Sequence, residues 1–184
     1  MNSFEQIAAR FFEAQGYWTR TGLKIEMTKA EKSALDNPSM PRPEIDIIAF
    51  KPGPNELLIV ECKSYLDSNG VREENFFGTS ERDKNRLKLF TRDRLRAFVT
   101  HKLIAQLRSE NLLLRANPTV KYGLVAGKSM SGHEAKVKQI FQDNRWLLVS
   151  PSDLATGLRK FASRGYEDDM VTMTVKILER NRVD

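Results

Sequence analysis

The sequence contains little cysteine and histidine. Cys62 is the single cysteine among 184 residues, so no intrachain disulfide can form. With only two histidines, His101 and His133, the chain cannot build the usual Cys/His zinc site. These shortages exclude a disulfide-stabilised secreted domain and a zinc finger, and a reducing, intracellular compartment is expected.

Long apolar runs are also missing. The N-terminal segment carries Glu5, Arg10 and Glu13 within its first fourteen residues, so it lacks the apolar core of a signal peptide. No stretch approaches the ~20 apolar residues that span a bilayer. The sequence also lacks a G-x-x-x-x-G-K-[ST] phosphate-binding loop, so it offers no motif for binding ATP. The sequence therefore predicts a cytoplasmic protein with no membrane partner.

Hydrophobic periodicity predicts alternating helices and strands in one domain over 1–184. A chain of this length with 40% hydrophobic residues can bury one core. Alternating elements form an α/β fold, with a mixed central sheet flanked by helices. The predicted helices cover 3–16, 83–114, 132–143, 152–161 and 168–180, and the predicted strands cover 23–28, 44–50, 57–64, 120–126 and 145–150, with loops over 29–43 and 64–81.

Basic residues are concentrated between positions 82 and 115. This segment holds ten basic and three acidic residues, a net charge of +7, whereas the whole chain carries +6. Such a stretch indicates a polyanionic partner such as nucleic acid, although a solvated helix face has the same composition. The residues expected to contact nucleic acid are Arg82, Lys84, Arg86, Lys88, Arg92, Arg94, Arg96 and Lys102.

Ionisable residues interrupt the two apolar runs that form the predicted hairpin. Side chains two apart on a strand point to the same side, so Glu61 and Lys63 project together and Cys62 faces the other way. Asp46 lies 15 residues before Glu61, on the preceding strand. The hairpin can therefore place two carboxylates side by side. Buried together they need a counter-charge, and Mg²⁺ suits them because it binds oxygen ligands.

An E-I-D triplet that ends at Asp46 and an E-C-K triplet that ends at Lys63 resemble the motif of the PD-(D/E)XK nuclease superfamily. The predicted order of elements also resembles its restriction-endonuclease-like αβββαβ core. That core would cover about 3–150, with extra C-terminal helices over about 151–184. The branch with Mrr and Holliday-junction resolvases is the most similar. One departure is that Ile45 replaces the motif's proline.

The resemblance implies a metal-dependent nuclease that cuts DNA internally with water activated by Mg²⁺. Asp46, Glu61 and the backbone carbonyl of Cys62 would hold Mg²⁺, with Mn²⁺ as a substitute. Lys63 would orient the attacking water or stabilise charge on the phosphate. Glu5 is a further candidate ligand, because the first helix of this branch often contributes a glutamate.

Two residues are candidate accessory groups. Gln106 falls in the apolar stripe of the basic segment, where solvation of the helix end is the alternative explanation. Tyr65 follows Lys63, and its ring can either stack on a base or anchor the core.

Two other functions stay open: a catalytically inactive nucleic-acid-binding module with the same fold, and an accessory subunit whose basic helix faces an acidic protein. A homodimer is compatible with a nuclease, because one site cuts one strand, but the sequence assigns no surface to it.

Overall fold

The computed structural model describes residues 2–77, 80, 85–113, 115 and 117–181. Arg82 and Lys84, both expected to contact nucleic acid, lie outside these residues. The strands are β1 (Trp18–Lys24), β2 (Glu44–Lys51), β3 (Glu56–Lys63), β4 (Thr119–Ala126) and β5 (Leu147–Val149). The helices are α1 (Ser3–Glu13), α2 (Lys29–Ala34), α3 (Glu74–Phe77), α5 (Lys88–Thr91), α6 (Asp93–Ser109), α7 (Glu134–Asp143), α8 (Pro151–Arg159) and α9 (Met170–Arg180), with a 3-10 turn, η1 (Lys160–Ser163).

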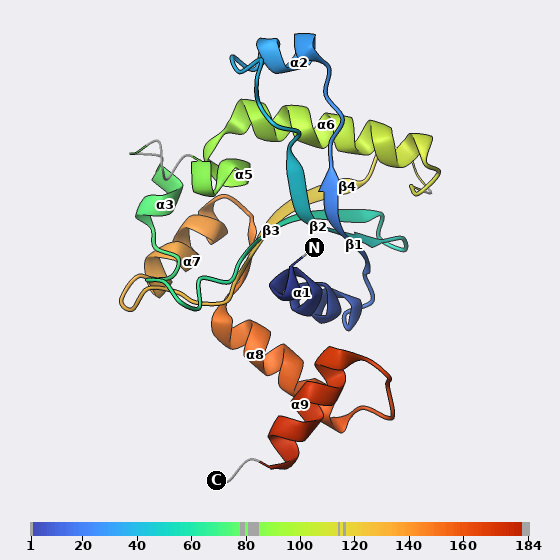
Figure 1. Ribbon diagram of the computed structural model, residues 1–184, viewed down its shortest axis with the longest axis vertical. Coiled ribbons are helices and arrows are strands. Elements are labelled where there is room, and N and C mark those ends of the chain that lie inside the picture. The colour runs from blue at the N-terminus through green and yellow to red at the C-terminus, as the bar shows by residue number, and fades with distance from the viewer. Residues whose placement is uncertain (1, 78–79, 81–84, 114, 116, 182–184) are drawn as a thin grey trace.

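A five-stranded mixed sheet in the order β1-β2-β3-β4-β5 forms the centre of the fold (Figure 1). β1, β2 and β3 pair antiparallel, and β3, β4 and β5 pair parallel. The predicted α/β class, with a mixed sheet flanked by helices, is confirmed. β3 is the central strand and both of its faces are covered, which explains its nearly continuous apolar run.

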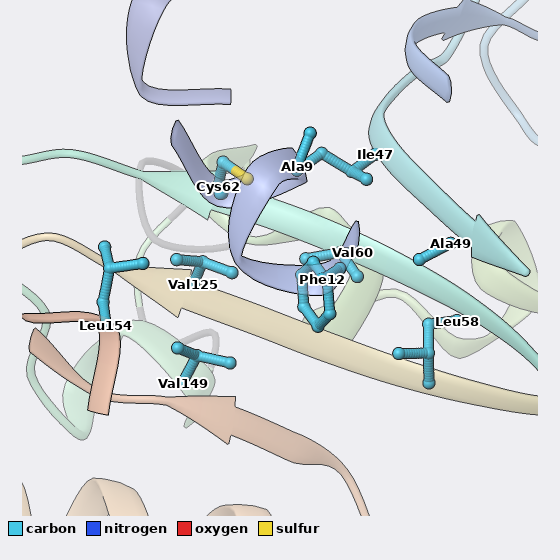
Figure 2. Close-up of a cluster of buried hydrophobic side chains, with 11 residues drawn as sticks. Ala9, Phe12, Ile47, Ala49, Leu58, Val60, Cys62, Val125, Val149 and Leu154 are labelled. Carbon is cyan, nitrogen blue, oxygen red and sulfur yellow. The ribbon is translucent and has the colours of Figure 1, made fainter. Parts of the chain in front are cut away.

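Helices cover both faces of the sheet. On one face α6 packs over Ile48 and Ile59, and α7 packs further along over β4. On the other face α1 packs over β3, and Figure 2 shows Phe12 of α1 close to Val60. Among the described residues, no helix is both long and apolar enough to cross a membrane.

The N-terminal half differs from the sequence prediction at two places. The first strand covers Trp18–Lys24 rather than the predicted 23–28, although Ile25 is fully buried and its N–H donates to the Pro43 carbonyl. Leu23 and Lys24 pair with β2, whereas the alternation beyond them reflects burial rather than strand pairing. The predicted loop 29–43 contains α2, which begins with a capping box formed by Thr28 and Glu31.

The helix predicted over 83–114 is confirmed over Asp93–Ser109, but it is not continuous, because the chain breaks at Arg92. The backbone of Arg92 has φ −128° and ψ +81°, which separates α5 from α6. Phe90 of α5 packs against Phe141 and Trp146, whereas Val99 of α6 faces a different apolar cluster. One straight helix cannot place Phe90 and Val99 in these two different clusters. The loop predicted over 64–81 likewise contains the short helix α3.

The C-terminal helices begin inside the core and continue beyond it. Leu154 of α8 belongs to the apolar cluster under α1 (Figure 2). Gly157 lies so close to Phe11 that a Cβ there would come within 2.4 Å of the ring. Beyond α8, Arg10 of α1 pairs with Asp169, the N-cap of α9, at 3.2 Å. These contacts fix α8 and α9 to the first helix.

Candidate active site

The β2–β3 ladder ends just before the acidic residues. Its last pair at this end is Ile47 with Val60. Beyond that pair, the Cys62 N–H donates to Asp46 Oδ2 over 2.7 Å. A side-chain carboxylate therefore takes the place of a backbone carbonyl, and the two strands separate where their charged groups lie.

The alternation of side chains along β2 is interrupted at Asp46. Ile45 and Ile48 pack in the same apolar cluster although they are three residues apart, whereas Ile47 packs on the α1 face. Gly22 of β1 lies opposite Asp46 and has φ +62°, a conformation that favours glycine. The irregular backbone turns the Asp46 carboxylate towards the end of β3.

Glu61 and Lys63 project together from the end of β3, as predicted. Lys63 Nζ donates to Glu61 Oε1 over 2.5 Å, and only 20% and 21% of the glutamate and lysine side chains are exposed. Cys62 faces the other way and is buried against α1 (Figure 2). The E-x-K triplet therefore presents one ion pair on the face that α6 covers.

The two carboxylates are not equally compensated. Burial, and next the Glu61 carboxylate, raise the pKa of Asp46 from 3.8 to about 7, against the opposing effect of the Cys62 N–H. Burial lowers the pKa of Lys63, but the Glu61 carboxylate outweighs it and the net pKa is raised. Lys63 thus stays protonated and balances one carboxylate, while the second lacks a counter-charge.

Glu5 is buried near this pair but has a structural partner of its own. It is 7% exposed and closes the capping box of α1, where its N–H donates to Asn2 Oδ1 over 2.9 Å. Its charge contributes to the raised pKa of Asp46. Among the described residues, however, Glu5, Asp46 and Glu61 do not bring one oxygen each within 4.8 Å of one another. Glu5 therefore adds negative charge near the site and caps the helix.

The donor groups at the end of the hairpin fit a hard divalent cation. Asp46 and Glu61 supply carboxylate oxygens, and the raised pKa of Asp46 indicates that the pair lacks positive charge. In a strand the N–H and C=O of one residue point to the same edge, so the Cys62 carbonyl points to the edge where its N–H meets Asp46. Oxygen ligands of this kind suit Mg²⁺ or Mn²⁺.

A cavity of about 250 Å³ opens beside the ion pair and is lined by both Glu61 and Lys63. Its other walls come from α6, from segment 85–89 and from the chain that leads into β2. Asp46 is not among its lining residues. Among the described residues that line it, cationic side chains outnumber acidic ones by five to two. The cavity therefore combines the candidate catalytic pair with a positive surround.

Only part of the predicted basic segment lies at this cavity. Arg86, Lys88 and Arg96 line it. Arg94 instead pairs with Asp36 at 3.1 Å, and both side chains are exposed. Neither residue lines the cavity, and their exposure makes this pair a surface contact.

Arg96 differs from an exposed helical arginine. Its side chain is 18% exposed, and its guanidinium lies over the rings of Tyr122 and Trp146 at 5.3 and 5.4 Å. It also donates to the Leu89 carbonyl over 3.1 Å. Arg96 is thus held by the fold and presents a fixed rather than a mobile charge to the cavity.

The remaining predicted contacts have partners elsewhere. Lys102 pairs with Glu31 at 2.9 Å and ties α6 to α2. Arg92 donates to Asn85 Oδ1 over 3.0 Å, next to the break between the helices. The basic segment therefore serves the fold as well as the cavity.

The two accessory candidates separate in the structure. Gln106 donates to Glu110 over 3.1 Å and is not among the residues that line the cavity. Tyr65 lies near Lys63, since its charge contributes to the raised pKa of that lysine, and the guanidinium of Arg86 lies 5.8 Å above its ring. Tyr65 alone of the two lies at the site.

The chain matches no known protein in these comparisons: family models, curated proteins and solved structures all give no match.

Sequence analysis gave no role to a second polar cluster between α3 and α7. Glu73 is buried and accepts hydrogen bonds from His133 Nδ1 and, over 2.8 Å, from Lys136 Nζ. The Lys136 hydrogen bond is the main cause that lowers the pKa of Glu73 to about 2. Glu73, Glu74 and His133 each bring one ligand atom within 4.8 Å of the others. No sequence spacing reveals this cluster, because its two halves lie about 60 residues apart.

One wall of the cavity was not predicted from the sequence. Met40 and Arg42 line it, although both fall in the segment predicted as a plain loop. Pro38, Pro41 and Pro43 lie around these two residues. Because proline restricts the backbone, they were the feature of the sequence that could have indicated a fixed path.

Proposed function

We propose that this protein is a metal-dependent phosphodiesterase acting on nucleic acid, with Asp46, Glu61 and Lys63 at its active site. One observation carries the proposal: an under-compensated carboxylate lies next to a glutamate–lysine ion pair that lines a basic cavity. The order α1-β1-β2-β3-α6-β4, with the short helices α2, α3 and α5 inserted between these elements, supports a restriction-endonuclease-like core. The family is proposed on these residues and this order together.

The metal would be Mg²⁺, or Mn²⁺ as a substitute, held by Asp46, Glu61 and the Cys62 carbonyl. A divalent ion bound there supplies a water of lowered pKa and withdraws charge from a phosphate oxygen. Asp46 would give up its proton on binding the ion, since its raised pKa keeps it partly protonated near neutral pH.

Lys63 contributes a fixed positive charge. It is mostly buried, and its ammonium is held 2.5 Å from Glu61 Oε1. During attack on a phosphodiester, negative charge builds on the phosphate oxygens. An ammonium already in position stabilises that charge more than it stabilises the bound substrate, so it accelerates the reaction rather than tightening binding.

The cationic lining of the cavity supports a polyanionic substrate. Arg86 and Lys88 come from the basic segment, and both line the cavity with Lys63. Phosphate groups of nucleic acid are the common polyanion that matches such a surface. DNA is the substrate that the resemblance implies.

The test is cleavage of plasmid and single-stranded DNA, and of matched RNA, in Mg²⁺ and in Mn²⁺, with binding followed in Ca²⁺. Wild type is compared with Glu61→Gln and with Glu56→Gln. Glu56 is a matched control, because it lies on the same strand and also pairs with a lysine, Lys121. Glu61→Gln should abolish cleavage, and Glu56→Gln should cut like wild type.

Other outcomes would replace the proposal. A wild type that binds nucleic acid but cuts none with any metal would be an inactive binding module. A wild type that neither binds nor cuts would fit an accessory subunit with an acidic protein partner.

A further inference from the structure

We infer that the cavity beside Glu61 and Lys63 receives one unpaired nucleotide, so that the substrate is single-stranded, flapped or bulged nucleic acid rather than continuous duplex. This rests on the proposed function and names the substrate class of the same site.

The cavity is small and walled by several elements. Its volume of about 250 Å³ lies just below the ~300–1,000 Å³ of pockets that bind drug-sized molecules. α6 forms one wall, the end of β3 a second, segment 85–89 a third and segment 40–45 a fourth. A space of this size suits a single nucleotide rather than a longer stretch of strand.

The lining combines two chemistries that a nucleotide also combines. Leu89 and Leu95 line the cavity and are partly exposed, so they provide apolar surface on which the flat face of a base can lie. Arg86 and Lys88 add positive charge that matches a phosphate. An apolar metabolite would leave these cations unpaired, and an inorganic anion would leave the apolar wall unused.

The position of the cavity connects it to the chemistry. Glu61 and Lys63 are themselves lining residues, so a nucleotide inside lies directly beside the ion pair. The phosphodiester that joins this nucleotide to its neighbour then lies at the cavity mouth. Binding of the base thus selects which phosphate meets Lys63.

A paired base cannot occupy this space. Inside a duplex each base is stacked and paired, and it can enter a walled pocket only after it swings out of the helix, which costs free energy. Single strands, flaps and bulges present bases that have already lost a pairing partner. The site should therefore cut such substrates faster than duplex of the same sequence.

The experiment compares a duplex with the same duplex carrying a one-nucleotide bulge, and with the single strand, in cleavage assays with Mn²⁺ and in binding assays with Ca²⁺. Leu95→Trp fills the cavity from α6, and Leu112→Trp makes the same change at an exposed position outside it. Wild type should prefer the unpaired substrates roughly tenfold or more. Leu95→Trp should remove that preference, and Leu112→Trp should keep it.

The outcomes separate this inference from the proposed function. Equal cleavage of duplex and bulge, unchanged by Leu95→Trp, overturns the nucleotide cavity and leaves the nuclease intact. If wild type cuts nothing, the nuclease fails, and the Ca²⁺ binding arm still decides: a preference for unpaired DNA that Leu95→Trp removes supports the cavity, and any other result overturns it.

A second pair of variants covers the case in which Leu95→Trp does not fold. Lys88→Glu reverses one charge of the lining, and Lys121→Glu reverses a charge at the opposite end of β3. Lys88→Glu alone should weaken binding of the single strand. Equal effects of the two variants would mean that the cavity does not bind the strand. Running the assays with DNA and RNA strands in parallel distinguishes the two sources of the nucleotide.

Discussion

A glutamate–lysine ion pair lies at each end of β3. The pKa of a carboxyl group is lowered at one end and raised at the other. At the start of β3, Glu56 pairs with Lys121 at 2.5 Å and also accepts a hydrogen bond from the Tyr17 hydroxyl. Burial raises the pKa of Glu56, but these partners outweigh it, and the net pKa is lowered. At its end the pKa of Asp46 is raised to about 7. The same residue types thus build a finished ion pair at one end and an incomplete site at the other.

The difference comes from the number of carboxylates per cation. Glu56 has a cation and a hydroxyl donor to itself. Glu61 shares Lys63 with Asp46, and the nearby charge of Glu5 adds to the excess. An excess of buried negative charge is unfavourable in the free protein and becomes favourable when a cation binds. The comparison therefore points to the end of β3 as the ligand site.

The largest expected effect on activity follows from replacing Lys63, and Lys121 provides the matched control. Lys63→Ala should lower the rate of cleavage roughly a hundredfold or more, because the lost group acts mainly in the transition state. Binding in Ca²⁺ should change little. Lys121→Ala should cut at a rate near that of wild type. Single-turnover cleavage of a labelled strand measures both variants, and equal losses would remove the distinction between the two ends.

A change at Asp46 should stabilise the protein at high pH. Its pKa is raised in the folded state, so the stability that it contributes is present below about pH 4 and is lost as pH rises through about 7. Asp46→Asn keeps a hydrogen-bond acceptor for Cys62 and cannot ionise. It should nearly match wild type at pH 4 and exceed it by up to about 4 kcal/mol at pH 8, since the pKa is raised by about three units and each unit is worth ~1.4 kcal/mol.

Urea unfolding in EDTA at the two pH values measures this difference. Added Mg²⁺ should favour wild type alone, because the variant lacks one carboxylate. A variant that is less stable than wild type at pH 8 would show that Asp46 is already compensated.

Glu56→Gln should give the opposite sign. The pKa of Glu56 is lowered in the folded state, so its stabilisation is present at neutral pH and is lost as pH falls through that lowered value. The variant should lose about 1 kcal/mol at pH 7, typical of a lost hydrogen bond, and progressively less as the pH falls below that lowered pKa. Unfolding midpoints across this pH range provide the measurement, and a loss that does not depend on pH would contradict the assigned ionisation.

The smallest effect concerns salt. Each phosphate contact contributes ~0.9 to the slope of log K against log salt for B-DNA, and ~0.7 for a single strand. Lys88→Ala should therefore flatten the slope for a single strand by roughly 0.7, because this lysine lines the cavity. Lys121→Ala should leave the slope unchanged. Binding titrations over a range of salt concentrations decide between a cavity contact and a general surface charge.

Local patterns were enough to predict the E-x-K side of the site. A period of two puts Glu61 and Lys63 on one side and Cys62 on the other, and the structure confirms this placement. The apolar run of the hairpin likewise predicted a central strand. Both features depend on neighbours within one strand, which a sequence shows directly.

Features that depend on distant packing were not predictable. Asp46 reaches its position through a break in alternation opposite Gly22, which no pattern along β2 reveals. The sequence pattern around Arg96 predicts an exposed helical cation, but Tyr122 and Trp146 cover its guanidinium from other parts of the chain. In each case a tertiary contact overrides the local pattern, so the residue types of the site could be predicted from the sequence, whereas their environment could not.

Because Cys62 is buried, the rate at which its thiol is alkylated measures how often this site opens. The only thiol of the chain lies between the two residues of the ion pair and packs under α1. Burial first, and then the Asp46 carboxylate, raise the pKa of this thiol, so almost none of it is the reactive thiolate in the folded protein. An alkylating reagent can reach it only when α1 separates from β3. The labelling rate of the unmodified protein therefore reports how often that separation occurs.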